Sequence, residues 1–184
     1  MESSLHCHQL IRGCGLELTE SKPPTLHTST ALFRFKLGEA IRNDSEALQH
    51  LGDFMDELLS DHEHISLYLD PVAIATGEDE ANETPVSTLL THVGSGQAES
   101  LVRLMLGVDA LQPRIISILL DKFPEFIGNE GGDQGGAGAT KVSVKILRQL
   151  RWLDYIIDSA RLTEKLLETL GYMPPEMQSE IISA

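Results

Sequence analysis

Two short clusters combine residue types that bind metals, His6-Cys7-His8 and His62-Glu63-His64. Histidine and cysteine side chains are the usual zinc ligands, but an i, i+2 pair cannot place both side chains on one face of a helix. Neither cluster has partners at C-x₂-C or H-x₃-H spacing, and the protease motif H-E-x-x-H is absent. The pattern favours solvated surface. A metal-dependent enzyme built on His6, His8, His62 and His64 is the alternative, and it requires stoichiometric zinc.

The glycine-rich run from Gly135 to Lys141 has some of the composition of a phosphate-binding loop. However, Thr140 precedes the lysine and Val142 follows it, where a phosphate loop has glycine and then serine or threonine. Val93-Gly94-Ser95-Gly96 likewise is not the G-x-S-x-G nucleophile elbow. The sequence therefore predicts no catalytic residues, no enzyme activity and no cofactor, and residues 128–140 are expected to form a loop.

Four cations follow this loop at helical spacing: Lys141, Lys145, Arg148 and Arg151. The first three share one helix face and Arg151 borders it, so the stripe is a candidate contact for a nucleic-acid backbone. We expect such contact only inside a larger and more basic assembly. A solvated face, or pairing with acids such as Asp154, is the simpler alternative.

The opposite charge dominates between Asn43 and Val102, where thirteen Asp or Glu residues occur with no Lys or Arg. This anionic half is either a solvated outer face or a docking surface for a basic partner. Over all 184 residues, 28 acidic and 14 basic side chains give a net charge of −14, so the segment by itself is a poor nucleic-acid ligand.

Composition indicates one globular domain, with 41% hydrophobic and 23% charged residues. No apolar run approaches the roughly 20 residues of a membrane span, and Met1-Glu2-Ser3-Ser4 does not begin a secretory signal. We therefore expect an intracellular protein with no membrane partner, in which Cys7 and Cys14 are free thiols.

Apolar residues recur at helical spacing almost throughout, and no stretch alternates long enough to predict a strand. The first expected helix covers Thr28 to Arg42, with Leu32, Phe35, Leu37 and Ile41 as its buried stripe. Asn43 and Glu46 form a predicted capping pair for the next helix. The remaining expected helices are Ala47–Leu59, Leu101–Leu106 ended by Gly107 as a C′ glycine, Gln112–Phe126, Lys141–Ile157, Leu162–Leu170 and Glu176–Ser183. Between them lie a short apolar segment, Ile65–Leu69, that stops before Pro71, and an acidic loop at 77–100.

Short helices joined by brief turns predict an all-α fold, specifically an α-solenoid in which helix pairs stack antiparallel. The last residues, Ile181-Ile182-Ser183-Ala184, end while the apolar pattern continues. We therefore interpret residues 1–184 as one incomplete segment of a larger solenoid. Such a segment exposes an apolar edge, so limited solubility or self-association is expected.

Several motifs are specific enough to suggest a family. They are Leu106-Gly107-Val108-Asp109-Ala110-Leu111-Gln112-Pro113-Arg114-Ile115-Ile116, Phe123-Pro124-Glu125, Gln149-Leu150-Arg151-Trp152-Leu153-Asp154 and Pro175-Glu176-Met177-Gln178. In order and spacing they resemble the N-terminal region of the Fanconi anaemia group D2 family. Gly15-Leu16-Glu17-Leu18 and residues 32–42 continue the similarity more weakly.

The resemblance implies a nuclear α-solenoid that pairs with a group I paralogue and clamps DNA. It further implies monoubiquitination by the ubiquitin machinery during interstrand crosslink repair and homologous recombination. Such a protein is a scaffold rather than a catalyst, and its ubiquitin-acceptor lysine lies outside this segment. The alternative is an unrelated helical-repeat adaptor that holds a basic partner on the anionic half.

Overall fold

Helices make up most of the part of the chain that the computed structural model describes, namely residues 2–19, 21–44, 46–75, 99–128, 136–150 and seven single positions between 160 and 178. In chain order the elements are α1 (Glu2–Gly13), β1 (Leu16–Thr19), β2 (Lys22–Leu26), α2 (Thr30–Asn43), α3 (Ala47–Ser60), α4 (Ile65–Leu69), β3 (Ala73–Ile74), α6 (Leu101–Leu106), α7 (Gln112–Gly128) and α8 (Gly136–Leu150).

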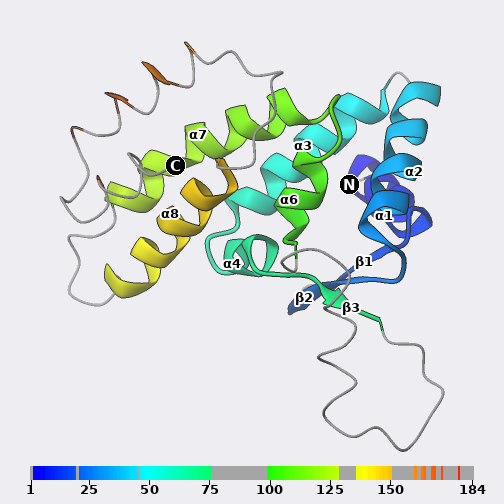
Figure 1. The fold of residues 1–184 in the computed structure, drawn as a ribbon, viewed down its shortest axis with the longest axis horizontal. Coiled ribbons are helices and arrows are strands. Elements are labelled where there is room, and N and C mark those ends of the chain that lie inside the picture. The colour runs from blue at the N-terminus through cyan, green and yellow to red at the C-terminus, as the bar shows by residue number, and fades with distance from the viewer. Residues whose placement is uncertain are drawn as a thin grey trace, which may run out of the picture.

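One hydrophobic core runs through these elements. α7 packs against both α3 and α8, and α1 covers another side of α3 (Figure 1). The short helix α6 contacts α2, α4 and α7, so it links the N-terminal helices to the C-terminal ones. No helix of the described residues is long and apolar enough to cross a membrane.

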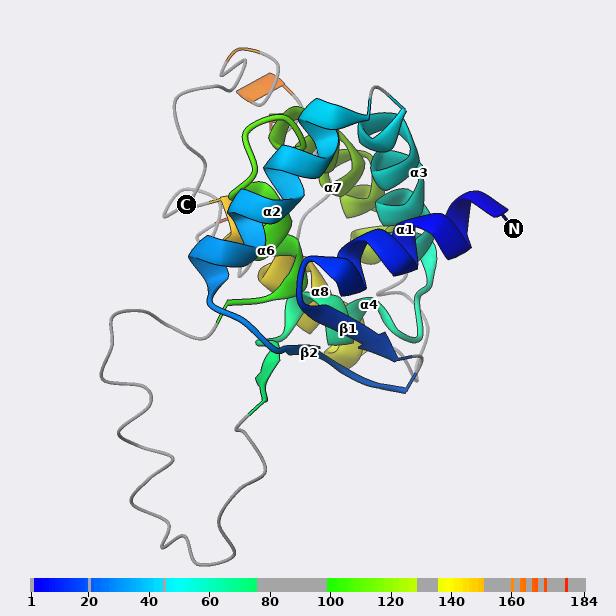
Figure 2. The same cartoon turned by 90° about the vertical axis from the view of Figure 1, so that its right-hand side faces the viewer.

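A small sheet corrects the strictly all-α prediction. Its strand order is β1-β2-β3, with β1 antiparallel and β3 parallel to β2, and it lies below α1 (Figure 2). The three strands have only four, five and two residues, which is too short for an alternating pattern to be visible in the sequence. Gly15 leads into β1 with a φ of 100°, and a Cβ there would lie 2.7 Å from Thr28 Cγ2.

The N-terminal helix α1 was not predicted. Its buried side chains include Cys7 and Ile11, while Leu5, His6 and His8 are exposed, so the apolar stripe is too narrow to detect.

The prediction for α2 had the right helix and two of its buried residues, Leu37 and Ile41, but was wrong for Leu32 and Phe35. Ser29 caps it by accepting a hydrogen bond from the Leu32 amide at 3.2 Å. The buried residues are Phe33, Leu37 and Ile41, whereas Leu32 is 43% and Phe35 is 61% exposed. Both sets satisfy helical spacing, so only the packing of α2 decides between them.

α3 and α6 agree with their predicted extents, but two predicted caps are wrong. Asn43 is the last residue of α2 rather than a cap, and the Asp44 carboxylate instead accepts from the Glu46 amide at 2.9 Å. Gly107 does end α6, but with a φ of −76° rather than in the left-handed conformation expected of a C′ glycine.

The predicted glycine loop at 128–140 is wrong in part. α7 continues to Gly128, and Gly136 to Thr140 form the start of α8. α8 is described as far as Leu150, so the end of the expected helix Lys141–Ile157 lies outside the described residues. Residues 76–98 of the acidic loop, and most of the two expected C-terminal helices, also lie outside them.

Candidate nucleic-acid interface

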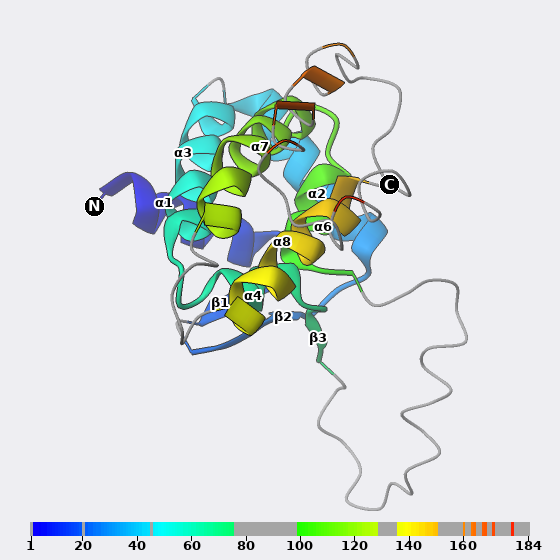
Figure 3. The same ribbon diagram turned by 90° about the vertical axis from the view of Figure 1, so that its left-hand side faces the viewer.

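The cationic stripe begins on α8, whose buried face includes Val142, Ile146 and Gln149. Because this face packs against α7 and α4, the opposite face of α8 is turned outward (Figure 3). Arg148 is exposed there. Nothing is described of the Lys141 side chain, and Arg151 lies outside the described residues.

Lys145 does not extend freely into solvent. Its Nζ lies 2.5 Å from Asp70 Oδ1 and donates to Ser66 Oγ at 2.7 Å, which leaves the side chain 25% exposed. The ammonium therefore joins α8 to α4 and to the residue that follows α4. Of the two stripe cations with described side chains, Arg148 is the one directed outward.

Among the described residues of the anionic half, Asp70 is one of three carboxylates that pair with a lysine or arginine from a distant part of the chain. Asp53 Oδ1 accepts from Arg114 Nη2 at 3.1 Å, and Glu99 pairs with Arg34. These pairs connect α3 to α7, the start of α6 to α2, and α4 to α8. Part of the negative charge that was predicted to dock a basic partner is thus paired with cations of the same chain.

Two of the paired arginines lie across glycines of neighbouring elements. A Cβ on Gly52 would lie 2.9 Å from Arg114 Cγ, and a Cβ on Gly107 would lie 2.1 Å from Arg34 Nε. Such separations are well below van der Waals contact, so hydrogen in place of a side chain lets each guanidinium cross the helix closely. Sequence analysis missed both contacts, because a glycine within a helical pattern carries no signal of what packs on it.

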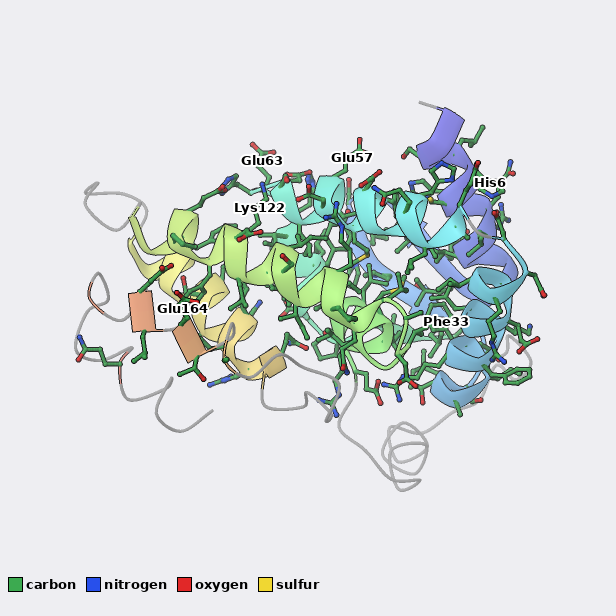
Figure 4. All side chains as sticks on the ribbon, turned by 90° about the horizontal axis from the view of Figure 1, so that it is seen from above. His6, Phe33, Glu57, Glu63, Lys122 and Glu164 are labelled. Carbon is green, nitrogen blue, oxygen red and sulfur yellow. The ribbon has the colours of Figure 1, made fainter. Side chains whose placement is uncertain are left out.

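Other acidic side chains remain at the surface. Glu57 of α3 and Glu63 of the turn after it project outward along the same edge (Figure 4). In that turn Asp61 accepts from the His64 ring at 2.7 Å and from the Glu63 and His64 amides. The His64 ring, more than the amide hydrogen bonds, lowers the pKa of the Asp61 carboxyl. The edge combining Glu57 and Glu63 fits the surface predicted for a basic partner, which stays a prediction.

The histidines contact groups other than one another. His8 lies edge-on to Phe54 with ring centroids 4.9 Å apart, His6 lies 3.9 Å from Asp44, and His62 Nε2 lies 3.6 Å from Glu125. Within the described ranges, no three His, Cys, Asp or Glu side chains gather as metal ligands. Cys7 and Cys14 are buried free thiols, and burial raises the pKa of each.

The longest sequence motif forms the junction between α6 and α7. Val108 and Leu111 are buried there, and Gln112, only 2% exposed, donates from Nε2 to the Leu106 carbonyl at 3.1 Å. The side chain therefore satisfies a carbonyl at the end of α6 while its own backbone begins α7. This junction shows why the motif combines apolar residues with one buried amide.

The comparison with known families is decisive. The family described as "Fanconi anaemia protein FancD2 nuclease" matches residues 2–184. The chain belongs to the Fanconi anaemia group D2 family.

Individual relatives agree. The chain is 29% identical over 178 residues to the Fanconi anemia group D2 protein homolog of Rattus norvegicus, and 28% identical over 180 residues to that of Mus musculus. Each match covers 96% of this chain and 11% of the relative. The Fanconi anemia group D2 protein of Gallus gallus is 38% identical over 101 residues, which is 55% of this chain and 6% of that protein.

The chain thus spans about a tenth of the length of these relatives. Membership in the group D2 family confirms the resemblance drawn from the motifs and replaces the alternative of an unrelated adaptor. The family name associates the chain with Fanconi anaemia.

Proposed function

We propose that this group D2 family chain is the N-terminal segment of a non-catalytic DNA-repair scaffold. In this proposal the helical packing continues beyond the described residues as an α-solenoid. The complete protein pairs with the group I paralogue in the nucleus, closes on DNA and is monoubiquitinated through regions outside this chain. Its roles are interstrand crosslink repair and homologous recombination.

The observation that carries the proposal is the family match over residues 2–184, together with the small share of each relative that the chain covers. A segment of a larger scaffold should contain helices that pack on both of their faces. α7 does so between α3 and α8, which supports a stack that can be extended.

The word "nuclease" in the family description names a catalytic alternative to the scaffold role. Nucleases of the metal-dependent type use clustered carboxylates to hold the ion. Here Asp53, Asp70 and Glu99 each pair with a cation that crosses to another element, which supports a structural role for them. We expect the full-length protein to leave single-stranded and branched DNA intact in Mg²⁺ or Mn²⁺. Cleavage that copurifies with the protein and disappears in an Asp53→Asn, Asp70→Asn, Glu99→Gln variant would overturn this part.

We further propose that the stripe of Lys141, Lys145, Arg148 and Arg151 meets the DNA backbone only within the complete assembly. Arg148→Glu in the full-length heterodimer should weaken DNA binding severalfold and reduce its salt dependence, because phosphate contacts release counterions. Lys36→Glu provides a control with a similar charge reversal at an exposed lysine of another helix, α2. Binding that is independent of salt, or equal in Arg148→Glu and the parent, would contradict the contact.

The first experiment is an immunoblot of nuclear extract with an antibody against this segment, before and after treatment with a DNA crosslinker. We expect a band far above 20.2 kDa that gains a form heavier by one ubiquitin. Immunoprecipitation should recover the group I paralogue. A single unmodified band at 20.2 kDa, present without the paralogue, would contradict the scaffold proposal.

A further inference from the structure

A groove lies beside the turn between β1 and β2. It has a volume of about 560 Å³ and is bounded by α1, the turn between β1 and β2, α3 and α4. Figure 2 shows how β1 and β2 run beneath α1 with α4 nearby. Sites for small ligands commonly have volumes of roughly 300–1,000 Å³, so the space can hold a few side chains.

The floor of this hairpin groove is apolar. Leu18 of β1 and Leu58 of α3 are partly buried and pack against the core, and Tyr68 of α4 is 6% exposed. Each of the two leucines therefore keeps some apolar surface uncovered toward the groove. An apolar side chain that enters would remove that surface from water, which is favourable.

The rim of the hairpin groove is polar. It carries the exposed residues Ser21 and Lys22, and the Thr19 hydroxyl donates to the Lys22 carbonyl at 3.4 Å across the turn. His8 lines the groove from α1, with its ring placed edge-on to Phe54. None of the described lining residues is acidic.

Lys22 differs from Lys145, Arg34 and Arg114 in its ion pairing. Those three cations form ion pairs that join elements of the fold, whereas Lys22 has no ion-pair partner among the described residues. Lys22 therefore offers a positive charge beside the uncovered apolar floor. Such a combination complements an apolar group that carries a carboxylate next to it.

We propose that the hairpin groove binds a short acidic and apolar segment of a partner protein. One apolar side chain lies between Leu18 and Leu58, and an Asp or Glu beside it in the partner pairs with Lys22. A peptide fits better than a compact small molecule, because the groove is partly open to solvent and exposed residues form its rim. The inference goes beyond the scaffold role and does not require DNA binding.

The two contributions should differ in size. Burial of the apolar side chain supplies most of the affinity, because an exposed ion pair contributes little. The lysine instead selects an acidic over a basic segment. A groove of this small size should bind the peptide with a dissociation constant of micromolar to millimolar order.

The test uses the full 184-residue chain and three fluorescein-labelled peptides, GSFDELG, its basic counterpart GSFKKLG and the anchor-free GSADEAG. Fluorescence anisotropy gives the affinities, and amide chemical shifts locate the site. We expect GSFDELG to bind and to shift the amides of Leu18 to Lys22, and GSADEAG to bind at least tenfold more weakly. Lys22→Glu should weaken GSFDELG about fivefold and strengthen GSFKKLG.

Lys36→Glu is the matched control, because Lys36 is an exposed lysine of α2 and the same charge change there should leave both affinities unaltered. The proposal fails if Lys22→Glu and Lys36→Glu weaken GSFDELG equally, since the effect is then only net charge. It also fails if GSADEAG binds as well as GSFDELG, or if GSFDELG shifts no amide of the hairpin. Octanoate that shifts those amides when no peptide does would identify a small-molecule site instead.

Discussion

Two phenylalanines of α2, Phe33 and Phe35, have opposite environments only two residues apart. Phe33 is fully buried and Phe35 is 61% exposed, although sequence analysis placed Phe35 in the core. Phe33→Ala deletes a buried ring, which destabilises by about 3–5 kcal/mol. Phe35→Ala deletes a ring that is mostly in water, so its effect should stay within about 1 kcal/mol, part of it offset by the higher helix propensity of alanine.

Urea denaturation followed by circular dichroism at 222 nm measures both free energies of unfolding. In a chain of this length the Phe33→Ala cost corresponds to a fall in melting temperature of roughly 6–20 °C. The pair controls for residue type, helix and substitution. Equal losses, or a larger loss for Phe35→Ala, would show that α2 buries the face predicted from the sequence and that the packing described here is wrong.

Two further predictions concern local contacts. Gly107→Ala should destabilise the folded chain by about 1–2 kcal/mol, because its Cβ displaces the Arg34 guanidinium from Glu99. Gly13→Ala should be neutral or slightly stabilising, because nothing lies within 4 Å of its Cβ. Equal melting curves for the two variants would contradict the close approach at Gly107. The pKa of Asp61 is lowered in the folded state mainly by His64. The ionised carboxylate therefore stabilises the fold above the pKa of an unfolded aspartate, and this contribution is lost as pH falls through the lowered pKa of the folded state. Asp61→Asn should therefore flatten the pH dependence of unfolding between about pH 5 and pH 3, and an unchanged slope would count against the hydrogen bond.

The sequence predicted elements well where their apolar stripe was wide. α3 and α6 begin and end within a residue of the predicted limits, because at least five buried side chains in each repeat at helical spacing. α1 was missed because only Cys7 and Ile11 of its described side chains are buried hydrophobics, which is too narrow an apolar stripe to indicate a helix. The sheet was missed because strands this short show no periodicity, and β2 contains two prolines.

The candidate site was predicted only as a charge pattern. The spacing of Lys145 and Arg148 correctly placed both on one helix, but nothing in the sequence indicated that Asp70 and Ser66 hold one of them. The partners are separated from Lys145 by 75 and 79 residues in the chain. Helical periodicity reports which residues share a face, and it carries no information about which distant element that face will contact.

Composition and motifs by themselves determined the helical class of most of the chain and its family, because both depend on local pattern and residue identity. The tertiary structure decided which side chains of α2 are buried, which carboxylates of the anionic half form ion pairs, and which lysine lies beside an apolar groove with no ion-pair partner in the described part of the chain. Each of these depends on contacts between elements far apart in sequence, and those contacts exist only after the chain has packed around its core.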